Sequence, residues 1–144
     1  AVADGPVQAG SAQPLVYGPA AYDAWIQALQ NAIAQPAAQQ AELAAASSRN
    51  LLDVRDAREA AAEVLRRALR RAPEEERRPL RNAIQLYGKM AWQINAAIKR
   101  GLFPHEHLEA WNDNLRGEEV KVLDTLRALD EQAGKTLRGI TPKR

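Results

Sequence analysis

Six apolar residues between positions 80 and 98 recur at alternating intervals of four and three residues. They are Leu80, Ile84, Tyr87, Ala91, Ile94 and Ile98. This heptad-like spacing places all six on one face of an α-helix, and other helices must cover such a face to keep it out of water. The segment therefore predicts a protein built from packed helices.

The composition and three further apolar stripes also favour helices. Alanine, leucine, glutamine, glutamate and arginine dominate the 144 residues, and only eight residues are glycine. We expect helices at about residues 20–46, 50–72, 79–100 and 104–136. Pro36 should kink or break the first helix, and Ser47, Ser48 or Asn50 should cap the second. Four helices with short connections predict an all-α, up-down-up-down four-helix bundle over residues 20–144.

Residues 1–19 contain three glycines and three prolines and show no apolar periodicity, which predicts an extended N-terminal arm. Leu15, Val16 and Tyr17 form its one apolar cluster, and we expect them to bind a groove on a partner. No apolar run approaches the roughly 20 residues needed to span a bilayer, so we expect the chain to be at most peripheral to a membrane, not inserted in it.

The charge of the chain is unevenly distributed. Residues 1–48 carry a net charge of −3, whereas residues 49–144 carry +5. The candidate partner-binding arginines are Arg66, Arg67, Arg70, Arg71, Arg77 and Arg78, followed by Arg81. They could contact an acidic protein surface or nucleic acid phosphates, or form a solvated corner balanced by Glu63 and Glu74–Glu76. No aromatic residue interleaves with these arginines, which counts against single-stranded nucleic acid. Our working hypothesis is an acidic protein partner and no nucleic acid.

The stretch RGLFPHEHLEAW contains both histidines of the chain. His105 and His107 are two residues apart, roughly 200° around a helix, whereas a helical zinc pair needs a spacing of four residues. Gly101 suits a left-handed cap after one helix, and Pro104 suits the first turn of the next. We therefore expect a structural corner here and no metal site.

The sequence shows no residue pattern typical of an enzyme active site. The chain has no cysteine, and its serines, Ser11, Ser47 and Ser48, lie in the arm or at an expected helix cap, far in sequence from either histidine. No glycine-rich loop suited to phosphate is present, and no ligands for a cofactor converge. We expect a protein that is not an enzyme and that binds no cofactor.

Four segments carry a resemblance to a known family: PLVYGPAA (14–21), VLRRALRRAPEEERRPLRNAIQLY (64–87), INAAIKRGLFPHEHLEAW (94–111) and VKVLDTLRALD (120–130). In this pattern the chain resembles the PsbQ-type extrinsic proteins of photosystem II. It departs from them by lacking their longer proline-rich stretch and by having RDAREAAAEVL in the second helix. The resemblance implies a non-catalytic four-helix bundle of the thylakoid lumen that docks on protein subunits of a larger membrane complex. Such a subunit helps the oxygen-evolving centre to retain calcium and chloride without ligating them.

Two other classes remain open. A periplasmic helical lipoprotein or chaperone-like adaptor would also use a flexible arm, and a cytosolic nucleic-acid binder would use the arginines. The chain begins with AVADG, from which we expect a removed targeting segment and an exported protein, in the thylakoid lumen or, alternatively, the bacterial periplasm.

Overall fold

A computed structural model of the chain describes residues 18–106, 108 and 111–140. Within these residues the protein is all-α and contains no β-strand, which confirms the all-α part of the expected fold class. The elements are α1 (Pro19–Gln30), the short 3-10 helix η1 (Ala32–Ala34), α2 (Ala37–Arg71), α3 (Glu74–Lys99) and α4 (Asp113–Arg138). Among the described residues, no helix is both long enough and apolar enough to cross a membrane.

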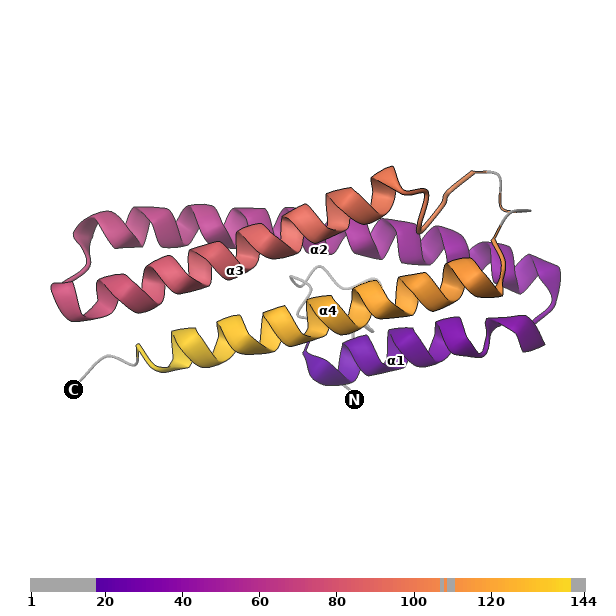
Figure 1. Ribbon diagram of the computed structural model, residues 1–144, viewed down its shortest axis with the longest axis horizontal. Helices are drawn as coiled ribbons and strands as arrows, with labels where there is room; N and C mark the ends of the chain where they lie inside the picture. The colour runs from indigo at the N-terminus through magenta and orange to yellow at the C-terminus, as the bar shows by residue number, and fades with distance from the viewer. Residues whose placement is uncertain (1–17, 107, 109–110, 141–144) are drawn as a thin grey trace.

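The four α-helices lie side by side, and the chain reverses direction from each one to the next (Figure 1). Helix α1 runs along α4, and α2 runs along α3. Helix α1 has 12 residues whereas α2 has 35, so α1 lies along only part of the length of the bundle. Among the described residues, the end at which α2 passes into α3 is therefore built from α2, α3 and α4 (Figure 1).

The helix expected at 20–46 is divided, and its second part belongs to α2. Gln35 precedes Pro36 and adopts an extended conformation, as the residue before a proline usually does, so the break near Pro36 is confirmed. The expected boundary at Ser47–Asn50 is wrong, because α2 runs through it without interruption. Ser47 is buried, and its Oγ accepts a hydrogen bond of 2.9 Å from Trp25 Nε1 of α1 instead of capping a helix.

The third helix begins at Glu74, five residues before the expected start at Pro79. Ala72 is extended ahead of Pro73, which forms the cap, and the three glutamates of the first turn lie at the positive end of the helix dipole. Pro79 lies inside α3. Its missing N–H removes one backbone hydrogen bond near the helix start, and packing of the remaining turns outweighs that loss.

Helix α3 ends as expected, but α4 begins later than expected. Gly101 has a φ of +87°, its N–H donates to the Ile98 carbonyl, and the Leu102 N–H donates to the Ala97 carbonyl, which together form a Schellman cap. The expected helix start at Pro104 is wrong. Helix α4 starts at Asp113, because Asn112 Oδ1 accepts the Leu115 N–H at 3.0 Å.

The core forms where all four helices are present. Tyr22 and Trp25 of α1 stack at 6.5 Å, and Trp25 meets the edge of Phe103 at 6.1 Å. Further fully buried side chains are Leu29, Leu51, Val54, Met90, Ile94, Leu123 and Leu126. The expected face of α3 is correct at Leu80, Ala91 and Ile94 but extends too far, since Ile98 is 38% exposed. Trp25 and Trp111 are also buried.

Candidate functional site

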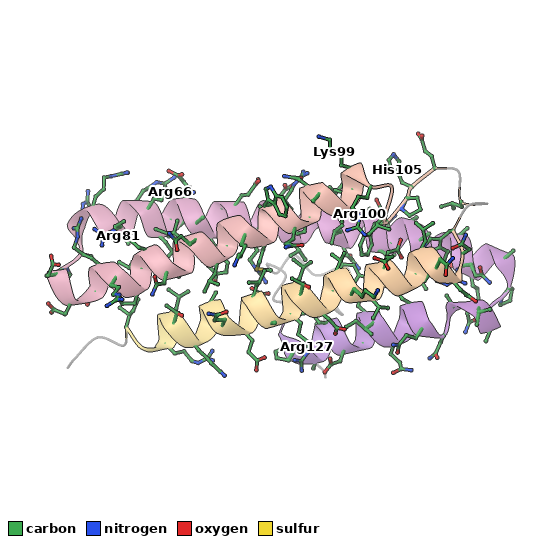
Figure 2. The ribbon with its side chains drawn as sticks, viewed as in Figure 1. Arg66, Arg81, Lys99, Arg100, His105 and Arg127 are labelled. Carbon is green, nitrogen blue, oxygen red and sulfur yellow. The ribbon has the colours of Figure 1, made fainter. Side chains whose placement is uncertain are left out.

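The candidate partner-binding arginines gather where α2 passes into α3. We call Arg66, Arg67, Arg70, Arg71, Arg77, Arg78 and Arg81 the basic corner. Figure 2 shows Arg66 and Arg81 toward this end of the molecule, and Lys99 and Arg100 toward the other end of α3. All members of the basic corner except Arg77 are exposed. The predicted arginines thus lie on the two helix ends that meet where α2 passes into α3, and most of them are accessible.

Few of these arginines are neutralised locally. Glu63 contacts Arg66 at 3.3 Å and Arg67 at 3.9 Å, in pairs whose side chains are at least half exposed. Arg77 donates to the Leu69 carbonyl at 3.1 Å, so it satisfies a free carbonyl at the end of α2. Within the described part of the chain, no ion pair involves Arg70, Arg71, Arg78 or Arg81.

The three glutamates next to the basic corner do not pair with it. Glu74, Glu75 and Glu76 form the first turn of α3, and among the described residues none makes an ion pair with an arginine. Their charges instead complement the helix dipole. Between residues 63 and 81 there are seven arginines and four glutamates, so the corner keeps a net charge of +3.

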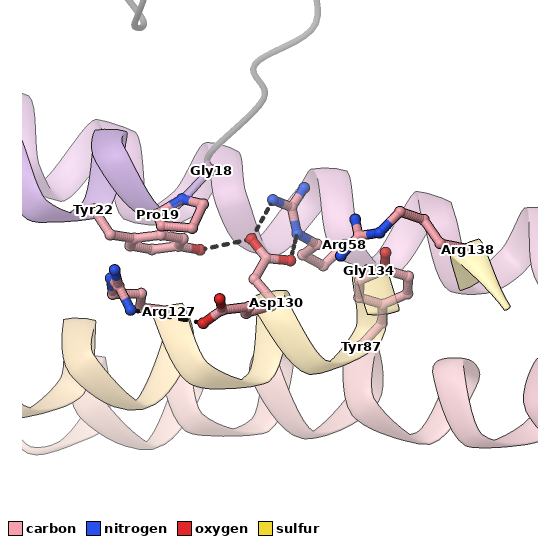
Figure 3. A pocket seen from close by; sticks show the side chains of 10 residues that line it. Gly18, Pro19, Tyr22, Arg58, Tyr87, Arg127, Asp130, Gly134 and Arg138 are labelled. Atoms are coloured by element: carbon pink, nitrogen blue, oxygen red, sulfur yellow. Dashed lines mark hydrogen bonds and ion pairs between the residues drawn. The ribbon is translucent and has the colours of Figure 1, made fainter. Parts of the chain in front are cut away.

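A polar cluster that the sequence did not predict lies where α1 begins. Arg58 of α2 donates to both carboxylate oxygens of Asp130 of α4, at 2.8 and 2.6 Å. The Tyr22 hydroxyl donates to the same carboxylate at 3.0 Å (Figure 3). The cluster borders a pocket of about 390 Å³, which Tyr87 and Arg127 also line.

This cluster ties three helices together. Burial alone would lower the pKa of Arg58, but its hydrogen bonds to Asp130 and the nearby carboxylate charge outweigh burial and raise that pKa. The guanidinium also lies 6.0 Å from the centre of the Tyr87 ring on α3. Asp130 already accepts three hydrogen bonds from these partners, so the geometry fits a structural role better than a catalytic one.

A second buried carboxylate holds the connection between α3 and α4. Glu119 is fully buried and accepts the Phe103 N–H at 2.7 Å and Trp111 Nε1 at 3.0 and 3.1 Å. Arg116 lies over the Trp111 ring at 4.8 Å. Burial raises the pKa of Glu119, although the hydrogen bonds and Arg116 oppose that rise. The carboxylate thus anchors Phe103, whose φ of 56° is unusual for a residue with a side chain.

The histidine segment lies in this connection and not at a helix start. His105 is 74% exposed, and its Nε2 lies 3.9 Å from a carboxylate oxygen of Glu106. His107 is outside the described residues, as are Leu15, Val16 and Tyr17 of the predicted arm. In the described ranges, no three or more His, Asp or Glu side chains are grouped so that they could hold a metal ion.

The spacing of the two buried carboxylates on α4 is a sequence signal of their burial. Glu119 lies four residues after Leu115 and three before Val122, and Asp130 lies between Leu126 and Ala133 with the same spacing. A charged residue on an apolar helix stripe needs a buried partner. The partner of Asp130 is 72 residues away in sequence, so the stripe could indicate burial but not the pairing.

Comparison of the chain with models of known protein families, with curated proteins and with solved structures found no match. The function of the chain therefore has to be inferred from its own side chains.

Proposed function

We propose that this protein is a non-catalytic helical subunit that docks on an acidic surface of a larger protein complex through its basic corner. The observation that supports this proposal is that most arginines of the basic corner form no ion pair with a neighbouring carboxylate in the described part of the chain. Glu63 alone pairs with its arginines among the described residues, while Arg70, Arg71, Arg78 and Arg81 remain exposed. A solvated corner balanced by Glu74–Glu76 would place those carboxylates against the arginines.

The bundle itself suits this role. We propose an up-down-up-down four-helix arrangement, which is supported by the reversal of the chain between successive helices (Figure 1). The two buried carboxylates, Asp130 and Glu119, fix helices and loops and leave the surface charges for recognition. In a rigid bundle, arginine side chains from two helices keep a fixed mutual arrangement, which lowers the entropic cost of docking.

The PsbQ-like pattern of the sequence would make the larger complex a photosynthetic membrane complex and the compartment the thylakoid lumen. The alternative within the same class is a periplasmic adaptor on a protein partner. In both cases Leu15, Val16 and Tyr17 would add an apolar contact to the charged one, with the chain peripheral to the membrane. Identification of the complex that co-purifies with the chain distinguishes the two.

The experiment is a charge reversal at the end of α2. Arg71→Glu, alone and together with Arg70→Glu, should weaken association with the complex and reduce its dependence on salt concentration. Arg49→Glu is the control, because Arg49 is also an exposed arginine of α2 but lies 22 residues before Arg71, about 33 Å along the helix from the basic corner. Circular dichroism should show equal helical content. Equal association of both reversed variants and the control would refute the proposal.

A further inference from the structure

The outward side of α3 carries an exposed tryptophan. Trp92 is 65% exposed, whereas Trp25 and Trp111 are buried. Trp92 follows Ala91, a member of the expected apolar face of α3, and so lies one position away from that face. A single exposed apolar side chain is ordinary on a protein surface, so Trp92 gains meaning only from the residues around it.

Along α3 itself, from Arg77 onward, the residues before and after Trp92 are basic or neutral. From Arg77 to His105 the chain has six lysines and arginines and no acidic residue. Four of the six are exposed and form no ion pair within the described ranges: Arg78, Arg81, Lys89 and Lys99. We call these four residues and Trp92 the α3 outer face. Because these four basic side chains have no counter-ion among the described residues, they are free to bind an anion from outside the protein.

The α3 outer face is straight and long. Arg81, Trp92 and Lys99 are separated by eleven and seven residues, which are close to three and two whole turns, so the three side chains project in one direction. The row extends for about 27 Å at 1.5 Å per residue. Figure 2 shows Arg81 and Lys99 near opposite ends of α3. A row of this kind matches a flat anionic surface better than a concave one.

A shallow recess of about 550 Å³ adjoins the face between α3 and α4. Asn82, Gln85 and Lys89 of α3 contribute two amides and an ammonium group to its lining, and no acidic residue lines it. These groups donate hydrogen bonds, which phosphate oxygens accept. The recess could thus hold a phosphate group beside the row of basic residues.

We propose that the α3 outer face binds the anionic headgroup surface of a lipid bilayer, with Trp92 in the interfacial layer and the basic side chains on lipid phosphates. Tryptophan is favoured at membrane–water interfaces, and basic residues near an anionic membrane each strengthen binding about five-fold. A protein partner fits less well. A tryptophan at the centre of a protein interface is normally ringed by contacts that exclude water, whereas Trp92 has Gly88, Ala96 and charged side chains as neighbours on its face. This proposal does not depend on the basic corner.

The test is co-sedimentation of the full chain with vesicles of phosphatidylcholine alone or mixed with phosphatidylglycerol. We expect the protein to sediment only with vesicles that contain phosphatidylglycerol and to be released by salt. Tryptophan emission should shift to the blue on binding, and because Trp25 and Trp111 are already buried, the shift reports Trp92. Trp92→Ala should abolish the shift.

Charge variants locate the binding surface. Lys89→Glu or Lys99→Glu should weaken binding roughly five- to thirty-fold. Arg49→Glu, the same charge change at an exposed position of α2 that does not line the recess, should alter binding by less than about two-fold. Equal loss in all three variants, or equal sedimentation with and without phosphatidylglycerol, would overturn the proposal. Binding to soluble polyglutamate without binding to the anionic vesicles would overturn it in favour of an acidic protein surface.

Discussion

Replacement of Asp130 by asparagine tests the polar cluster that joins α1, α2 and α4. Asp130→Asn keeps the shape of the side chain but removes the charge that accepts two hydrogen bonds from Arg58 and one from Tyr22. The side chains of Arg58 and Asp130 are only 13% and 11% exposed. The variant therefore leaves a mostly buried guanidinium without a counter-ion.

The expected loss follows from that burial. Removal of one partner of a buried ion pair costs about 3–5 kcal/mol. Because the pair borders an open pocket of about 390 Å³, water can reach the guanidinium, and we expect the lower end, about 3 kcal/mol. For a chain of this size the melting temperature should fall by roughly 6–12 °C. Urea titration followed by far-UV circular dichroism measures the free energy of unfolding directly.

Two controls separate burial from charge. Arg127→Met removes the pair with Asp23, whose side chain is 60% exposed, and should cost no more than about 1 kcal/mol. The double variant Arg58→Met/Asp130→Leu removes both buried charges and should recover most of the loss. The reasoning is refuted if Asp130→Asn destabilises the protein no more than Arg127→Met.

Three further variants test other parts of the fold. Ile94→Ala, at a fully buried position of α3, should lower the free energy of unfolding by about 2–5 kcal/mol in the same titration, and a silent change would mean that this face does not form the core. His105→Gln should leave stability and partner binding unchanged, whereas loss of a bound metal in elemental analysis would contradict a structural role. Burial raises the pKa of Glu119, so its stabilising contribution is present below the ordinary glutamate pKa and is lost as pH rises through the folded-state value. The stability of the protein relative to Glu119→Gln should therefore fall as pH rises through that range, and a difference independent of pH would contradict the burial of a titrating carboxyl.

The helical class and two of the helix ends could be predicted because the residues responsible act locally. Pro36 fixes its own φ angle and lacks an N–H, and Gly101 can adopt a positive φ, so their effects on the helix ends do not depend on distant contacts. Ser47 is a counterexample. A serine caps a helix only where the chain leaves the helical conformation. Here α2 continues through Ser47, and the Ser47 hydroxyl accepts a hydrogen bond from Trp25 of α1.

The candidate site also has one part that the sequence predicts and another that only the structure shows. The basic corner is visible in the sequence because its arginines lie within 16 consecutive residues, from Arg66 to Arg81. The absence of pairing with Glu74–Glu76 among the described residues required the structure, since sequence proximity suggested the opposite. The α3 outer face likewise could not be recognised from the sequence alone, because it depends on the exposure of Trp92.

Site-specific crosslinking tests the docking role of the basic corner most directly. The chain contains no cysteine, so Arg70→Cys and Arg49→Cys each give one attachment point for a photoreactive crosslinker, both on exposed positions of α2. We predict that the probe at position 70 crosslinks to an acidic segment of one subunit in the complex that co-purifies with the chain, and that the probe at position 49 does not. Equal crosslinking from both positions, or none from position 70 while the complex is bound, would contradict docking through the basic corner.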